Sequence, residues 1–292
     1  MHYMRRFPDR TRAVVVDGVV PPTFALGANI AIRSQITFDA LLARCAADQH
    51  CDATFPDLRG QFERVKARLN EQPLPLELRH PVTGLPTEIE LTYGHLAIWV
   101  RLALYAPETS ALIPLVIHQA AVEENYLPIA ANALNVLHQL NESMQYGMHN
   151  AVVCTEDAPF FEDDVVAEGE LEATYLGRDL YDALAVMCSV WPAGFMDEDM
   201  KAPLESDIPT LVLSGEFDPI TPPDYGEAIM PGLSNATHIV APGQGHGVLP
   251  RGCVPRITLE FVEQPDPNAV DASCTEHLGT FPFFVDFMGP KP

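Results

Sequence analysis

The sequence predicts an α/β fold in which a parallel sheet is interrupted by a large helical insertion. Three short, nearly continuous apolar runs are bounded by turn residues, a pattern typical of strands buried on both faces of a parallel sheet. Between the first and second runs, apolar residues are spaced as in helices. Polar loops directly follow the last two runs, where open α/β sheets place their ligand-binding groups.

The three apolar runs are Arg12–Val20 (RAVVVDGVV), Thr210–Ser214 (TLVLS) and Thr237–Val240 (THIV). A helix is expected at Pro223–Met230, between the second and third runs. A strand, a helix and a strand in this order favour a right-handed crossover between parallel neighbours. Three strands leave an open sheet edge, so we expect further strands outside this sequence.

Residues 27–200 are expected to form an all-helical insertion, flanked by core segments at residues 1–26 and 201–292. Two stretches within it are expected to be irregular, the turn-rich His80–Pro86 and the acidic Glu156–Glu172. The segments with helical spacing are Ile30–Ala47, Leu58–Leu69, Gly94–Tyr105, Ser110–Ala121, Pro128–Leu140 and Asp179–Val190.

The opening segment (MHYMRRFPDR) is typical of the end of an amphipathic helix, which Pro8 and Asp9 stop. No N-cap residue precedes this helix, and the segment lacks the apolar stretch of a signal peptide. We therefore expect Met1 to be an internal methionine of a longer polypeptide.

The composition is apolar and strongly acidic. Hydrophobic residues make up 47% of the chain, which excludes a disordered chain. The length of 292 residues suits one large domain or two modest ones. The formal charge of −23 disfavours nucleic acid and anionic membrane surfaces as partners. The longest apolar stretch, Leu96–Ala106, is broken by Arg101 and is too short to span a bilayer. The expected partner is a peptide or another small molecule, and nothing in the sequence requires a metal or an organic cofactor.

The six cysteines favour disulfides and therefore an oxidising compartment, although six cysteines allow many pairings. The alternative is a cytosolic protein with six reduced, buried thiols. No C-x-x-C pair or adjacent histidine cluster indicates zinc. Pairing in chain order is the simplest arrangement and would join Cys45 with Cys51, Cys154 with Cys188, and Cys253 with Cys274.

Two loops carry the residues with the clearest chemistry. Asp218 lies in SGEFDPITPP after the second apolar run, and His246 lies in PGQGHG after the third. Because the carboxyl ends of neighbouring parallel strands meet at one sheet edge, we expect the two side chains to lie together. An aspartate that accepts from one imidazole nitrogen fixes the tautomer and stabilises the imidazolium, so the other nitrogen can act as a base. The alternative is a turn-forming aspartate and an ordinary loop histidine.

The order of an aspartate loop, a helix, a strand and a histidine loop resembles the C-terminal half of an α/β-hydrolase. The segments GMHNAVVCTEDAPF, SGEFDPITPPDYGE, GQGHGVLPRGCVPR and DASC…FPFF resemble the exported tripeptidyl-aminopeptidase-like (TAP-like) branch of the prolyl aminopeptidase family. YMRRFPDRTRAVVVDGVVPP is similar to the segment that follows the nucleophile elbow in that family. The resemblance covers nearly the whole chain.

This resemblance implies that Asp218 is the acid and His246 the base of a catalytic triad. It also implies that the helical insertion is a cap over the active site and that the cysteines pair in chain order. The serine of the family lies in a G-x-S-x-G elbow, and the sequence contains no such pattern. We therefore expect an inactive fragment of a serine peptidase, whose nucleophile is encoded roughly 5–12 residues upstream of Met1.

An aminopeptidase must pair the free ammonium group of its substrate with carboxylates. Glu156 and Asp157, which follow Cys154, are the candidates, and the alternative for both is an acidic surface loop. The leading hypothesis is an aminopeptidase, periplasmic or secreted, that acts through an acyl-enzyme. The alternatives are an ester, lactone or epoxide hydrolase on the same scaffold and a catalytically dead ligand-binding protein.

Overall fold

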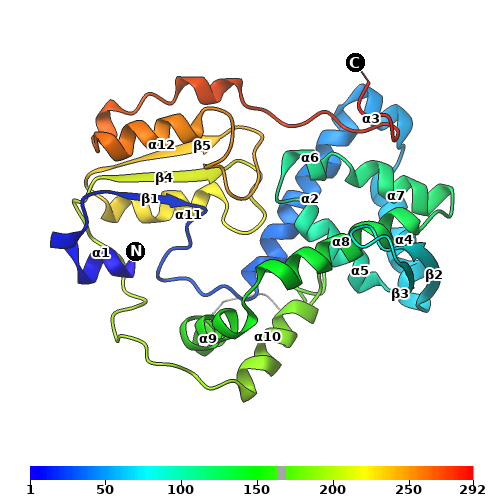
Figure 1. Ribbon diagram of the computed structural model, residues 1–292, viewed down its shortest axis with the longest axis horizontal. Helices are drawn as coiled ribbons and strands as arrows, with labels where there is room; N and C mark the ends of the chain where they lie inside the picture. Colours follow the sequence, from blue (N-terminus) through cyan, green and yellow to red (C-terminus); the bar gives the residue numbers. More distant parts are fainter. Residues whose placement is uncertain (164–168, 292) are drawn as a thin grey trace. The chain divides into compact units, whose positions relative to one another are not determined.

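The computed structural model of the chain describes residues 1–163 and 169–291, which divide into two compact units (Figure 1). The sheet unit contains Met1–Gln35 and Tyr146–Thr280, and the helical unit contains Ile36–Gln145 and Phe281–Pro292. These units are defined by contacts within the chain. The division into a catalytic core and a substrate-selecting cap stays a prediction.

A three-stranded parallel sheet with the order β1-β4-β5 forms the centre of the sheet unit. β1 (Val14–Asp17) pairs with β4 (Thr210–Gly215), beginning with Val14 opposite Thr210, and β4 pairs with β5 (Ala236–Ala241). The three strands fall within or around the three predicted apolar runs. The fold class is therefore α/β, as predicted.

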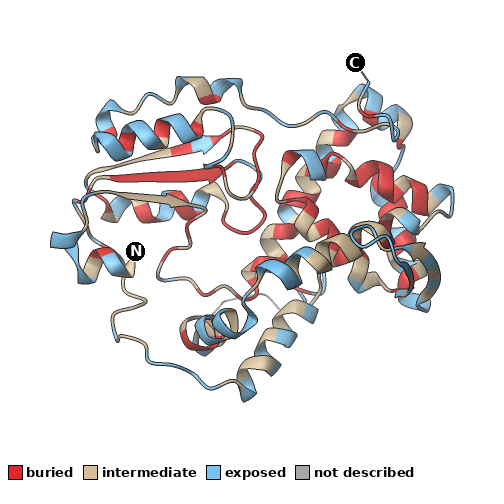
Figure 2. Ribbon diagram, in the orientation of Figure 1, coloured by how far each residue is buried: buried red, intermediate tan, exposed pale blue. Residues whose placement is uncertain are grey.

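Helices cover both faces of this sheet, with α12 (Val254–Glu263) on one face and α11 (Pro223–Ile229) on the other (Figure 1). Every residue of β4 is buried (Figure 2), which matches its continuous apolar sequence. Because successive side chains of a strand point to opposite faces, Leu211 and Leu213 pack with α12, whereas Val212 packs on the side of α11.

β1 differs from the prediction in length and in burial. The predicted strand covers Arg12–Val20 and is buried on both faces, whereas the observed strand contains Val14–Asp17 and is half-buried throughout. The reason is its place at the edge of the sheet, where β4 is its only strand partner among the described residues.

The other elements of the sheet unit are helical. α1 ends before Pro8, as predicted, and residues 164–168 of the predicted acidic loop Glu156–Glu172 lie outside the described residues. α9 and α12 lie outside the segments for which helices are predicted. Besides α11 and α12, the elements are α1 (His2–Arg6), η1 (Pro8–Arg10), α9 (Tyr146–Glu156), η2 (Ala158–Asp163), α10 (Asp179–Val190), η3 (Met230–Gly232), η4 (Pro267–Ala269) and η5 (Ser273–His277), and α2 (Asn29–Ala47) contributes residues to both units.

In the helical unit α4 packs against α7, and α5 packs against α8. None of the described helices of the chain combines the length and the apolar character needed to cross a membrane. The elements of this unit are α3 (Gln49–Thr54), α4 (Leu58–Glu71), β2 (Leu74–Arg79), β3 (Pro86–Leu91), α5 (Tyr93–Ala103), α6 (Pro107–Ser110), α7 (Ile113–Val122) and α8 (Leu127–Ser143).

The expectation of an all-helical insertion is wrong, because β2 and β3 form an antiparallel hairpin. The predicted turn-rich break at His80–Pro86 contains the connection of this hairpin, residues 80–85, in which the N–H of Gly84 donates to the carbonyl of His80 (2.8 Å). Along β2, half-buried Leu74, Leu76 and Leu78 alternate with exposed residues, and along β3, exposed residues alternate with half-buried Thr87 and Ile89 and with buried Leu91. That two-residue period is the sequence signal for a strand with one covered face.

Candidate active site

Asp218 lies in the loop that joins the carboxyl end of β4 to α11. Its Oδ1 accepts hydrogen bonds from the backbone N–H groups of Ile220 (2.9 Å) and Thr221 (2.8 Å), and its Oδ2 accepts from the Thr221 hydroxyl (2.8 Å). Such local bonds are typical of an aspartate at the start of a turn. They hold the carboxylate in one orientation, with its side chain fully buried.

His246 lies in the loop after β5 and meets Asp218 at the same edge of the sheet. His246 Nδ1 lies 2.9 Å from Asp218 Oδ2. An ionised carboxylate only accepts hydrogen bonds, so Nδ1–H is the donor and Nε2 is the nitrogen that can take up a proton. The His246 side chain is 34% exposed, so a substrate can reach the ring while the carboxylate stays buried. The structure thus brings together the two residues that the sequence singles out.

The surroundings of Asp218 lower the pKa of its carboxyl. Burial raises this pKa, but the hydrogen bond and the charge of His246 lower it, as do the backbone N–H groups of Thr221 and Ile220. The lowering effects prevail, so the carboxyl is ionised at neutral pH. An ionised carboxylate in this position stabilises a neighbouring imidazolium.

Thr221 is a third member of this cluster, which the sequence motifs do not single out. Its hydroxyl donates to Asp218 Oδ2 and lies 3.1 Å from His246 Nδ1. Because the single hydroxyl proton goes to the carboxylate, the Thr221 oxygen faces the ring N–H as an acceptor. The signal in the sequence is a threonine three residues after the aspartate in DPIT. At such short spacings, aspartate and threonine side chains form local hydrogen bonds within a turn.

A second histidine contact lies within the strands themselves. On β5, His238 has its Nε2 2.9 Å from Ser214 Oγ on β4. Ser214 is fully buried. Burial lowers the pKa of His238, while the charge of Glu227 acts in the opposite direction. A substrate cannot reach a hydroxyl without exposed surface, so this pair is a packing contact between two strands.

Glu156 and Asp157 lie elsewhere in the sheet unit, where α9 ends. Both line a cavity of about 290 Å³ that also includes Lys201 but does not extend to the aspartate–histidine pair. Asp157 Oδ1 accepts from the backbone N–H of Leu26 (3.1 Å) and pairs with Lys201 Nζ (3.4 Å). Lys201 therefore balances the charge of Asp157, whereas Glu156 has no ion pair among the described residues.

All six cysteines form disulfides, in the pairs expected from chain order and from the family resemblance. The structure thus has three disulfides where the alternative expects six reduced thiols, and disulfides are consistent with an extracellular location. The bonds join Cys45 to Cys51, Cys154 to Cys188, and Cys253 to Cys274.

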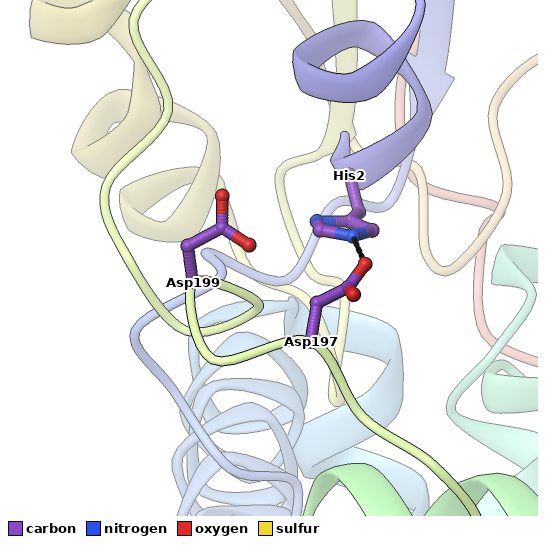
Figure 3. Close-up of side chains that lie close together, drawn as sticks. All are labelled: His2, Asp197 and Asp199. Atoms are coloured by element: carbon purple, nitrogen blue, oxygen red, sulfur yellow. Dashed lines mark hydrogen bonds and ion pairs between the residues drawn. The ribbon is translucent and has the colours of Figure 1, made fainter.

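His2, Asp197 and Asp199 lie close enough together to be considered as metal ligands (Figure 3). His2 Nε2 lies 2.7 Å from Asp197 Oδ2. The guanidinium of Arg6 pairs with both carboxylates, at 3.2 Å for Asp197 and 2.5 Å for Asp199. Because the carboxylates already have cationic partners, the geometry favours a salt-bridge network at this surface.

Residues 173–274, about a third of the chain, match the protein family described as TAP-like protein. The matched region includes Asp218 and His246. No curated protein is found to match the chain. Together with the parallel sheet, the family match confirms the resemblance over residues 173–274, which match the TAP-like region of α/β-hydrolases. This family suggests hydrolase activity.

Proposed function

We propose that the chain is the C-terminal portion of a serine hydrolase, an exported aminopeptidase that removes residues from peptide N-termini. The observation that carries this proposal is the 2.9 Å contact between His246 Nδ1 and Asp218 Oδ2, beyond the ends of neighbouring parallel strands. α/β-hydrolases order their nucleophile, acid and histidine along the chain, and the acid and the histidine occur here in that order.

In the proposed mechanism, His246 Nε2 takes the proton of a serine hydroxyl as the serine oxygen attacks the carbonyl carbon of the substrate. Asp218 fixes the ring tautomer and stabilises the imidazolium. The imidazolium then gives its proton to the leaving amine, the C–N bond breaks, and an acyl-enzyme ester remains. A water molecule, deprotonated by the same nitrogen, attacks the ester, releases the carboxylic acid and restores the serine.

The nucleophile in this proposal comes from a part of the polypeptide outside these 292 residues, because the sequence contains no G-x-S-x-G. In α/β-hydrolases one oxyanion-hole donor follows the nucleophile, and the other belongs to an earlier loop. The half-buried edge strand β1 supports the proposal, since an open edge presents backbone groups to which a further strand can bind. The 292 residues alone are therefore expected to be inactive.

The proposed location is the periplasm or the cell exterior. It is supported by the three disulfides, because disulfides persist in oxidising compartments and are rare in the cytosol.

The proposal is tested by labelling with a fluorophosphonate, which reacts with activated serine nucleophiles. The polypeptide that includes the upstream reading frame should be labelled at an elbow serine, and the 292-residue chain alone should not. A longer polypeptide that resists labelling would favour an aspartate nucleophile or a binding role. Labelling of the shorter chain would contradict the proposed origin of the nucleophile.

Glu156 is proposed to bind the ammonium group of the substrate, because it has no ion pair among the described residues, whereas the charge of Asp157 is balanced by Lys201. In the full-length enzyme, Glu156→Gln should raise KM roughly tenfold for peptides with a free N-terminus and leave N-blocked esters unchanged. The matched control is Asp157→Asn, which should lower thermal stability and affect both substrates alike. Equal losses on both substrates in Glu156→Gln would discard the assignment.

A further inference from the structure

Asp17, the last residue of β1, is bound to the loop that carries His246. Its Oδ1 accepts from the backbone N–H of Val248 (3.0 Å), and its Oδ2 accepts from the backbone N–H of Leu249 (2.8 Å). Each carboxylate oxygen thus has its own donor. These two bonds fix the backbone two and three residues after His246.

The histidine loop needs such an external anchor because glycines flank His246 on both sides. Gly247 has a φ of +81°, a conformation that glycine adopts readily. A chain with this freedom does not by itself hold a ring in one orientation. The bonds to Asp17 begin at the residue after Gly247 and connect the loop to the rigid end of a strand.

Gly18, which follows Asp17, leaves room for the imidazole ring. A side-chain carbon at Gly18 would lie 3.1 Å from His246 Cε1 and 2.7 Å from Thr221 Oγ1. The backbone at the end of β1 therefore lies directly against the ring. One short segment both anchors the histidine loop and borders the space that the ring occupies.

We propose that Asp17 is a positioning residue for His246: by accepting from Val248 and Leu249, it holds the loop so that Nδ1 faces Asp218. Asp17 bonds only to the backbone of the loop in this interaction, so its effect on a reaction is indirect and depends on the position of the His246 ring. The catalytic meaning of this role rests on the proposed function, whereas the placement of the ring can be measured without any catalysis.

Two substitutions at Asp17 should give graded losses, and a third provides a matched control. Asp17→Asn keeps one acceptor oxygen but turns an NH₂ group toward the second backbone donor, and Asp17→Ala removes both acceptors. The control is Asp48→Ala in the helical unit, because Asp48 also accepts from two backbone N–H groups, those of His50 (2.9 Å) and Cys51 (2.8 Å).

The experiment is NMR spectroscopy of the 292-residue chain and its variants. The ¹⁵N shifts of the His246 ring report which nitrogen carries the proton, and hydrogen exchange reports the protection of the Val248 and Leu249 amides. Asp17→Ala should speed the exchange of both amides roughly tenfold or more and move the ring from the Nδ1–H form toward a mixture of tautomers. Asp17→Asn should be intermediate, and Asp48→Ala should leave both readouts unchanged.

An unchanged His246 tautomer in folded Asp17→Ala would overturn the proposal, even if the amides exchange faster. In that case the bonds between Asp17 and the loop would have no effect on the ring. Unchanged amide exchange would overturn it as well. If Asp17→Ala does not fold, Asp17→Asn decides by the same criteria. Should the tautomer depend on Asp17 while the full-length protein resists the fluorophosphonate, the proposed function fails and the positioning role stands.

Discussion

Two histidines near the same pair of strands make contacts of equal length but of different chemistry. His246 Nδ1 lies 2.9 Å from Asp218 Oδ2, beyond the ends of β4 and β5, and His238 Nε2 lies 2.9 Å from Ser214 Oγ, within them. The first histidine has a charged partner and a partly exposed side chain, whereas the second has a neutral partner without exposed surface. A donor–acceptor distance alone therefore does not identify a catalytic pair.

Position relative to the strand ends explains the difference. Within a strand, side chains alternate between the two faces of the sheet, and helices cover both faces here. A loop beyond the strand is free of that constraint and can present a side chain to a ligand, as open α/β sheets do at their carboxyl edge. Burial accordingly lowers the pKa of His238 and keeps it neutral, which suits packing rather than proton transfer.

The largest expected effect is a difference in catalytic activity between variants of the two histidines. In the proposed longer polypeptide, His246→Gln should reduce kcat for an ester substrate by at least about 10³-fold, because the proposed general base is lost. His238→Gln, the matched substitution, should change kcat by less than about threefold, because its contact lies within the fold. Comparable losses of kcat in both variants, at equal thermal stability, would contradict the assignment of different roles to His246 and His238.

A smaller effect is expected in the dependence of stability on pH. Burial raises the pKa of Asp218, but the contacts with His246 prevail and lower it, so the contribution of Asp218 to stability is complete above about pH 4 and lost as pH falls further. The lowered pKa of His238 also makes the protein less stable as pH falls, but this loss begins at a higher pH. Its contribution is complete above about pH 6.5 and declines as pH falls below that value.

Urea unfolding of wild type, Asp218→Asn and His238→Gln from about pH 8 to about pH 3 measures both windows. The free-energy difference between wild type and His238→Gln should shrink as pH falls through the upper window. The difference for Asp218→Asn should shrink only in the lower one. A His238→Gln difference that stays constant down to about pH 5 would show that His238 is not held neutral by burial.

Local sequence patterns were sufficient to predict most of the secondary structure and the central contact of the site. Apolar runs predict β4 and β5 to within a residue or two, and Pro8 correctly ends the first helix. The contact between Asp218 and His246 follows from topology, because adjacent parallel strands bring their carboxyl ends together. The same reasoning leaves the division into core and cap, and the roles of these residues, as predictions.

Contacts between distant parts of the chain could not be predicted in this way. Asp17 and Val248 are 231 residues apart, and a carboxylate at the end of an apolar run does not specify which backbone group it will bind. The β2–β3 hairpin is hard to predict for a different reason. Its two-residue alternation was present in the sequence but lies within a region dominated by helical spacing, which favoured an all-helical interpretation.

The disulfide between Cys253 and Cys274 makes the region beside the histidine loop sensitive to the redox state of the environment. Cys253 lies seven residues after His246 and immediately before α12, and its partner lies in η5. Such a bond typically stabilises a fold by about 2–4 kcal/mol, and bonds of this kind are rare in the reducing cytosol. A chain kept under reducing conditions would lack this tether, so the stability of the region beside the histidine loop depends on the redox state of its environment.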